Sequence, residues 1–459
     1  MKKINILLAF ACIILLMSSC SKYLDDIKPE HAIPQSSLTE SDIDKLLNGV
    51  YASMEYYVYS FWWNDDIQGE NFGTGNSSSY MPDPCNMSPL SVNSNVSVLS
   101  FWRNSYSIIN QINFILEMYE NSENKDGDTM KRIAGTAYYF RAFIYYRLAS
   151  HYGNVPILNK RTEEIVPISP ESQVWAFVES DIDKALSLTD TQSSKWFVST
   201  DAINALAARI ALFQGKTTEA VNYADLVLKN TNYALVKNSM DFSSIFLPAS
   251  ASTEIIFGYI NNSRTSKYVD FASVVNDTDG SWSYGPSQDC YANLYADNAA
   301  TLQVGDIRKD ATFSSNPKYY ARIIKFGNGQ QQLAKNNDYR HTPVIVSRIA
   351  EMYLIKAEAL GKNLGAATLH TFLQSRYKNA LTENSIKGLS DLDYQNLILD
   401  ERRREFFAEG MRWQDIKRTK RYDLLKTLNG RTYLMYYPIP QEEIDIAGKT
   451  AYPQNPGYE

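Results

Sequence analysis

The stretch ALAARIALFQGKTTEAVNYADLVL, residues 205–228, decides the fold class. Its apolar residues recur at helical spacing on both sides of Gly215, which is the pattern of two amphipathic helices joined by a tight turn. EALGKNLGAATLHTFLQ, residues 358–374, repeats this layout, and Gly361 takes the place of Gly215. A helix–turn–helix unit of about 34 residues with small residues at its close contacts is typical of tetratricopeptide repeats. We therefore predict a mainly α-helical fold with tetratricopeptide-like repeats, long irregular loops and a few short strands.

Further helices are predicted on both sides of this unit, by the same spacing of apolar residues and by Gly and Pro stops. A segment without helical period, 61–100, is rich in Gly, Ser, Asn and Pro. A loop-rich insertion of about 241–343 separates the two repeat copies and holds two strand-like runs, EIIFGYI (254–260) and YYARIIKF (319–326). The predicted helices cover 42–59, 101–120, 129–151, 171–188, 199–230, 344–361, 365–380, 391–409 and 411–427.

The N-terminus indicates secretion and a lipid anchor. Lys2 and Lys3 precede an apolar run, and Ser18 and Ser19 lead to Cys20. The apolar run is shorter than the about 20 residues that span a bilayer, and the order of charged, apolar and small residues is that of a secretory signal. We expect residues 1–19 to be a signal peptide, Cys20 to be lipidated, 20–40 to be a tether, and 41–459 to be the folded domain. An ordinary signal cut elsewhere is the alternative.

Charge and cysteine content exclude several functions. The chain has 45 Lys and Arg against 51 Asp and Glu, a net charge of −6, without a long basic run. Nucleic acid is therefore not an expected partner. After the expected cleavage and lipidation, only Cys85 and Cys290 carry thiols; they could pair, and they cannot form a metal-binding cysteine motif. The four histidines are far apart in sequence, so we expect neither a metal nor a cofactor.

A dense run of charge, DERRREFFAEGMRW (400–413), has two readings. Arg404 can pair with Asp400 and Glu401 along one helix, while Phe406 and Trp413 would face the core. An anion site is one reading, and a structural ion-pair network is the favoured one. We read Arg141 in RAF, 141–143, in the same way.

Aromatic residues outside the helical pattern are the best candidates for ligand binding. The chain has 32 Tyr, 19 Phe and 7 Trp. Aromatic faces stack on the C–H faces of sugar rings, and neighbouring polar groups can bond the hydroxyls. The alternative is that these rings anchor long loops onto the helical body. The predicted ligand-binding residues are the aromatics Trp62, Trp63, Tyr80, Trp282 and Tyr284, with Asn64, Asp65 and Gln288 as hydrogen-bonding partners.

Several segments, taken in order over nearly the whole chain, carry a resemblance to a known family. These segments are YLD after Cys20, WRNSYSIINQINFIL (102–116), RAFIYYRLASHYGNVPI (141–157), residues 205–228, GSWSYGPSQD (280–289), VIVSRIAEMYLIKAEAL (344–360), ILDERRREFFAEGMRWQDIKR (398–418), YPIPQEEI and QNPGY. Together they resemble the SusD/RagB family of outer-membrane lipoproteins. The resemblance implies the helical-repeat fold and a surface-exposed, lipid-anchored protein that binds a glycan or a peptide. It also implies delivery of that ligand to a SusC-like TonB-dependent outer-membrane transporter.

Other functions remain as alternatives to glycan binding. A peptide-binding RagB-like protein would have a deeper, wetter cleft. A surface glycosidase would need two carboxylates facing each other across a cleft; Asp65, Asp66 and Glu70 are close in sequence, but acidic residues on a polar loop are usually solvated. A purely structural repeat scaffold would bury the loop aromatics. We expect a binding protein, not an enzyme.

Overall fold

Helices dominate the computed structural model, which describes residues 38–74, 96–190, 194–261, 275, 284–297, 303–314, 323–326 and 342–458. The chain divides into two compact units, residues 1–45 and 46–459. The first helix within the described residues, α3, spans Glu40–Gln68, and the hydroxyl of Thr39 caps it by accepting from the Asp42 N–H at 3.3 Å. All other elements described below lie in the second unit.

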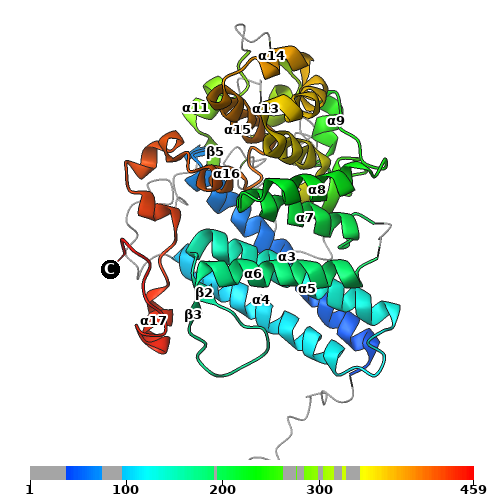
Figure 1. Ribbon diagram of the computed structural model, residues 1–459, viewed down its shortest axis with the longest axis vertical. Coiled ribbons are helices and arrows are strands. Elements are labelled where there is room, and N and C mark those ends of the chain that lie inside the picture. The colour runs from blue at the N-terminus through cyan, green and yellow to red at the C-terminus, as the bar shows by residue number, and fades with distance from the viewer. Residues whose placement is uncertain are drawn as a thin grey trace, which may run out of the picture. The chain divides into compact units, whose positions relative to one another are not determined.

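Three long helices pack side by side after α3. They are α4 (Val96–Glu120), α5 (Asp128–Tyr152) and α6 (Glu171–Leu188), and α5 lies against both of the others (Figure 1). From Met130 to Tyr152 the side chains of α5 are buried or half-buried, because α5 has neighbours on several faces. Arg141 in the middle of α5 forms a buried pair with Asp181 of α6 at 2.7 Å, so this arginine is structural, as predicted.

The predicted repeat units form helix pairs. α7 (Thr200–Phe213) and α8 (Thr217–Leu228) are joined at Gly215, whose φ is 74°. The second copy lies within α13 (Ile349–Arg376), which breaks at Gly361 with a φ of 69°. Only glycine adopts such angles without strain, which explains the same residue at both turns. α8 packs against α7 and α13, and α13 packs against α15 (Asp391–Glu405).

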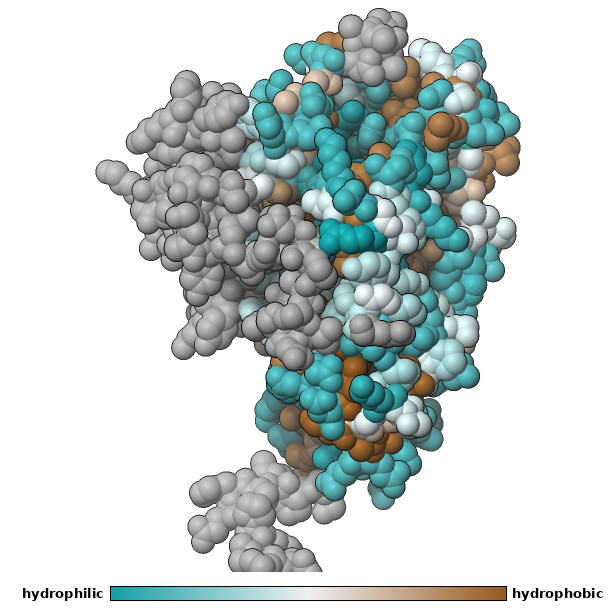
Figure 2. Space-filling model, turned by 90° about the vertical axis from the view of Figure 1, so that its left-hand side faces the viewer, coloured by the Kyte–Doolittle hydropathy of each residue, from teal (hydrophilic) through white to brown (hydrophobic). Residues whose placement is uncertain are grey.

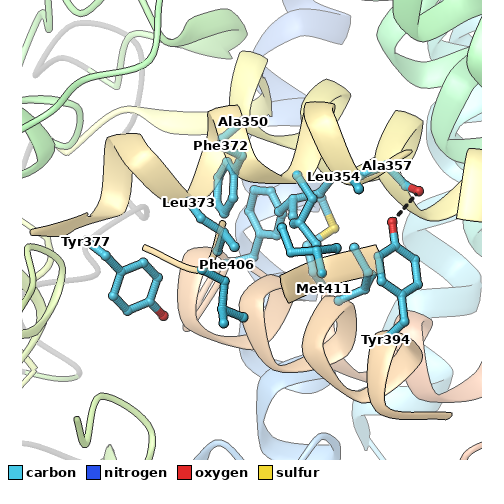
Figure 3. Packing of buried hydrophobic residues seen from close by; sticks show 14 residues of the cluster. Ala350, Leu354, Ala357, Phe372, Leu373, Tyr377, Tyr394, Phe406 and Met411 are labelled. Carbon is cyan, nitrogen blue, oxygen red and sulfur yellow. Dashed lines mark hydrogen bonds between the residues drawn. The ribbon is translucent and has the colours of Figure 1, made fainter. Parts of the chain in front are cut away.

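One apolar cluster joins the two halves of α13 to α15 (Figure 3). Leu354 and Phe372 are fully buried, and Phe406 and Met411 close the cluster from the segment after α15. The hydroxyl of Tyr394 donates to the Ala357 carbonyl at 2.7 Å, which satisfies a backbone group near the break of α13.

The described residues form four two-stranded antiparallel sheets, and all but the β2–β3 sheet connect segments that are far apart in sequence. They are β1 (Phe72–Thr74) with β5 (Tyr284–Pro286), β2 (Val155–Pro156) with β3 (Ile168–Ser169), β4 (Ile255–Tyr259) with β7 (Val344–Arg348), and β6 (Val304–Asp306) with β8 (Tyr377–Asn379). In the described part of the chain, the remaining short helices are α9 (Ser239–Ser244), α11 (Gln288–Asn293), α12 (Lys309–Thr312), α14 (Glu383–Lys387), α16 (Arg412–Thr419) and α17 (Gln441–Ala447), with 3₁₀ turns at Tyr422–Leu424, Lys426–Leu428 and Thr432–Met435.

Several predicted boundaries are wrong. The prediction ended the first helix at Tyr59, but α3 continues to Gln68. The helix predicted from 344 begins at Ile349, because Val344–Arg348 pairs with β4 as a fully buried strand. The next helix ends at Arg376 instead of 380, and the segment 411–427 forms α16 followed by 3₁₀ turns. The strand expected in EIIFGYI is confirmed as β4.

A buried ionic network lies where α15 meets β4, β7 and the end of α13. Glu405 accepts hydrogen bonds from Arg308, Arg348 and Arg376, and all four side chains are at most 1% exposed. The predicted pair of Glu401 with Arg404 is present at 2.8 Å. The ion-pair reading of the DERRREFF run is therefore confirmed, and Phe406 and Trp413 lie in the core as expected.

Candidate functional site

Three aromatic rings form a cluster beside the β1–β5 sheet, and it is called the aromatic cluster below. The ring of Tyr284 stacks on that of Trp63, with centroids 5.8 Å apart and 23° between planes, and on that of Phe72 at 5.9 Å. Trp63 and Phe72 are 5.7 Å apart. Phe72 and Tyr284 are at least 92% buried, whereas Trp63 is only partly buried. The cluster thus presents Trp63 on a rigid aromatic backing.

Strand pairing brings the cluster together. Thr74 pairs with Tyr284, and Phe72 pairs with Pro286, so the two segments are fixed in register. Trp63 comes from the last turns of α3. Phe407, from the turn after α15, packs edge-to-face with Phe72, with ring centroids 5.8 Å apart and 89° between the ring planes. Edge-to-face and offset-stacked rings are the preferred aromatic geometries, so this packing holds Trp63 in one orientation.

The predicted location of Trp62, Trp63, Asn64 and Asp65 on an irregular polar segment is wrong, since all four lie in α3, where Trp62 and Asp65 are also buried. Trp62 stacks on Phe326 at 5.9 Å. Asp65 accepts from Arg147 at 2.6 Å and contacts His151 Nε2 at 2.8 Å. Both residues anchor the end of α3 to the helical body. Their side chains are turned away from any surface where a sugar hydroxyl could reach them, because they pack against interior partners.

The other acidic residues of this segment are also structural. Asp66 is fully buried and accepts from the backbone N–H groups of Gly410 at 2.5 Å and Ala408 at 3.3 Å. Both residues have positive φ, so Asp66 holds an unusual turn that carries Phe407. Glu70 Oε1 accepts from the N–H and the hydroxyl of Thr427. The expectation that these acidic residues are solvated is wrong for Asp65 and Asp66, which are both fully buried.

Burial and charge move the pKa values of Asp65 and Asp66 in opposite directions. Burial raises the pKa of Asp66 to about 7, although hydrogen bonds from Asn71 and Gly410 act against this shift. Burial would also raise the pKa of Asp65, but Arg147 and His151 outweigh it and hold that pKa below its ordinary value. Two neighbouring carboxyl groups whose pKa values are shifted apart can serve as the acid and the base of an enzyme. Here neither carboxylate is exposed, so this pair does not support the glycosidase alternative.

Polar side chains lie near the aromatic cluster. Gln288 is exposed at the start of α11. It follows Ser287, whose N–H donates a hydrogen bond to the Asn71 backbone carbonyl. Asn64 is half-buried and donates to the Ser60 carbonyl at 3.3 Å. The sequence reasoning missed Arg403, which donates to Asp289 Oδ2 at 3.1 Å and to the buried Cys290 sulfur at 3.1 Å. Its position in the charged run gave no signal that it reaches this sheet.

Some predicted residues lie outside the described part of the chain. These are the lipidation residue Cys20, the aromatics Tyr80 and Trp282, and Cys85, with the signal peptide and most of the tether. Trp63 and Tyr284 are therefore the two predicted aromatics that the structure places together. Among the described residues, no helix has the length and apolarity of a membrane span, and no group of three His, Cys, Asp or Glu is arranged to hold a metal.

The side of the chain that carries α11, α16 and α17 shows a mainly hydrophilic surface over its described residues, with small apolar areas between (Figure 2). The helix pairs joined at Gly215 and Gly361 define a helical-repeat protein. Its sequence matches a family model described as "Starch-binding associating with outer membrane" over residues 22–212 and the SusD family model over residues 298–431. The chain belongs to the SusD/RagB family.

Relatives and solved structures agree with this assignment. SusD-like protein P2 of Formosa agariphila is 27% identical and is covered over the full length of both chains. A SusD-like protein of Bacteroides fragilis superposes with a TM-score of 0.76 at 20% identity, covering 93% of this chain and 99% of that one. A SusD-like carbohydrate binding protein of Bacteroides vulgatus gives 0.67 at 22% identity, covering 83% of each chain. These structures share the predicted mainly helical fold.

Proposed function

We propose that this protein captures an oligosaccharide or polysaccharide at the aromatic cluster and delivers it to a SusC-like TonB-dependent transporter. The observation that carries the proposal is the partly exposed Trp63 stacked on Tyr284. A sugar ring can lie on an indole face with its C–H bonds toward the ring, while polar groups at the rim bond its hydroxyls. Binding by this means changes no bond in the ligand, so the protein acts as a binding protein and not as an enzyme.

Family membership supports the proposed role in nutrient binding at the outer membrane. The family is one of outer-membrane-associated nutrient-binding proteins, and the solved structure from Bacteroides vulgatus is that of a SusD-like carbohydrate binding protein. Lipidation at Cys20 would hold the protein at the outer surface of that membrane. Tyr80, Trp282 and Gln288 stay in the proposal as further ligand contacts, because they flank the cluster in sequence.

The test is a calorimetric titration of the mature protein with a panel of oligosaccharides and peptides. We expect heat with one glycan class and a loss of at least tenfold in affinity in Trp63→Ala. Tyr56→Ala is the matched control, since Tyr56 is an aromatic of the same helix, 45% exposed and outside the cluster.

Two outcomes would replace the proposal. Binding of peptides with no response to glycans would favour the peptide-binding alternative. Release of reducing sugar during the titration would favour the glycosidase alternative, which needs a carboxylate pair other than Asp65 and Asp66 because both are buried.

A further inference from the structure

A cavity, called the α7 pocket below, lies where α7 begins and α8 ends, at the opposite end of this helix pair from the Gly215 turn. Its volume is about 370 Å3. Small-molecule sites in proteins have volumes of about 300–1,000 Å3, so the α7 pocket is large enough for a monosaccharide. Its walls come from the turn before α7, the turn after α8 and the loop that enters β4, and buried Ile255 and Ile256 line its base.

The pocket walls are fixed by hydrogen bonds within the protein. Lys195 Nζ donates to the Ser252 carbonyl at 2.5 Å, and the Gly258 N–H donates to the Lys195 carbonyl at 3.1 Å. Thr253 and Ala234 are joined by two further bonds between the loop and the turn. A pocket that is already formed loses little conformational entropy when a ligand binds, and this favours the binding of a small polar ligand.

The pocket holds one cation and one anion that are not paired with each other or with any other charge in the described part of the chain. Among the described residues, Lys195 Nζ has a hydrogen bond only to a backbone carbonyl, and burial lowers the pKa of its amine. Asp201 Oδ2 accepts from Asn230 at 2.7 Å and from the Tyr233 hydroxyl at 3.3 Å, both neutral donors. Lys195 is partly buried, and a partly buried lysine without an ion-pair partner at the wall of a cavity indicates a site for an anionic group.

The remaining polar groups favour a sugar acid over an amino acid or dipeptide. An amino acid would present an ammonium group to Asp201, whose carboxylate is already stabilised by two neutral donors. Asn230 already donates to Asp201 and accepts from the Asn232 N–H at 3.1 Å, and the hydroxyls of a sugar can use the remaining donor and acceptor capacity of the two asparagine amides. A sugar acid has a carboxylate for Lys195, hydroxyls for Asp201 and both asparagines, and a ring face for Tyr233.

We propose that the α7 pocket is a second binding site, separate from the aromatic cluster, that holds a uronic acid with its carboxylate on Lys195 and its hydroxyls on Asp201, Asn230 and Asn232. The uronic acid can be a free monosaccharide or the end of an acidic glycan. The site does not depend on the function proposed for the aromatic cluster, because no residue is common to the two.

The experiment titrates the mature protein with galacturonate, trigalacturonate, galactose and alanyl-alanine. We expect galacturonate to bind, with affinity at least tenfold weaker in Lys195→Met, retained in Lys195→Arg and unchanged in Trp63→Ala. Lys387→Met is the charge-matched control, since this lysine is half-exposed and pairs with Glu383 on α14. Tighter binding of trigalacturonate identifies a glycan end as the ligand, and equal or weaker binding identifies the free sugar.

Three results would overturn the proposal. Galactose bound as tightly as galacturonate would remove the role of Lys195. Preference for alanyl-alanine would make the ligand a peptide. Absence of galacturonate binding, or its loss in Trp63→Ala with retention in Lys195→Met, would leave the α7 pocket without this ligand. The melting temperature of each variant distinguishes lost binding from lost folding.

Discussion

Arg376 and Glu405 form two parallel hydrogen bonds, Nε to Oε2 at 2.8 Å and Nη2 to Oε1 at 3.0 Å, between fully buried side chains. The same carboxylate also accepts from Arg308 and Arg348. These arginines hold the pKa of Glu405 well below its usual range, despite burial that acts to raise it. Glu405 is thus the common partner of three buried cations that come from three different segments.

Replacing this carboxylate is expected to destabilise the fold strongly. Glu405→Gln leaves three buried guanidinium groups short of negative charge, and breaking a buried ion pair costs about 3–5 kcal/mol. Urea unfolding followed by circular dichroism measures the free energy of unfolding. Glu383→Gln is the control, because its pair with Lys387 is about 40% exposed and such pairs contribute about 0–1 kcal/mol. Equal losses in the two variants would contradict a central role for Glu405.

Asp66 links the fold to the binding site. Asp66→Ala removes the acceptor of the Ala408 and Gly410 N–H groups, and an unsatisfied buried donor costs about 1–3 kcal/mol. We expect this loss in the free energy of unfolding and weaker ligand binding, because the turn that Asp66 holds carries Phe407 against Phe72. Calorimetric titration at a temperature where the variant is still folded separates the two effects. Unchanged affinity would show that the cluster is stable without this turn.

The fold class was predictable because it depends on spacing. Leucines and alanines at helical intervals, with a glycine at each turn, predict the α7–α8 pair and the two halves of α13. The end of α3 was not predictable, because Trp62, Asp65 and Asp66 have no apolar period and are buried by partners far away in sequence, such as Phe326 and Arg147. A polar or aromatic run looks the same in a loop and in a helix that is covered by distant segments.

The candidate site was predictable only in part, for a related reason. Residue type pointed to Trp63 and Tyr284, but their stacking depends on the pairing of β1 with β5, which are over two hundred positions apart. The same reasoning could not separate Trp63 from its neighbour Trp62, which faces the interior. Lys195 and Asp201 gave no signal at all, because a cavity is formed by turns that only the tertiary fold brings together.

Glycine at position 365 is required for close helix packing. A Cβ built there would lie 2.2 Å from the Ala357 carbonyl oxygen and 2.9 Å from the Tyr394 hydroxyl. Gly365→Ala is expected to reduce the free energy of unfolding by about 1–3 kcal/mol, the usual range for overpacking. Gly49→Ala, in an open position on α3, should instead increase it by about 0.4–1 kcal/mol. Thermal unfolding of both variants checks the contrast, and a gain in Gly365→Ala would refute the packing argument.

Lys417 is a buried amine whose hydrogen bonds go to backbone carbonyls. Its Nζ donates to Ser150 at 2.6 Å and to Met435 at 2.7 Å, and lies 3.4 Å from the ring centroid of Tyr436. Burial lowers the pKa of Lys417 to about 7, although Glu171 and Asp65 act to raise it. These bonds join α16 and the C-terminal segment to the end of α5.

This shift predicts a stability that increases with pH. Between pH 7 and the ordinary lysine pKa of 10.5, the unfolded chain binds a proton that the folded chain has released, so raising the pH favours the folded state. The slope reaches about 1.4 kcal/mol per pH unit at most. We expect urea unfolding at pH 7, 8 and 9 to show this increase in the wild type, and a smaller one in Lys417→Met, which has no amine to titrate. Parallel profiles for the two proteins would show that Lys417 stays charged in the folded chain, held by its two carbonyls and the face of Tyr436.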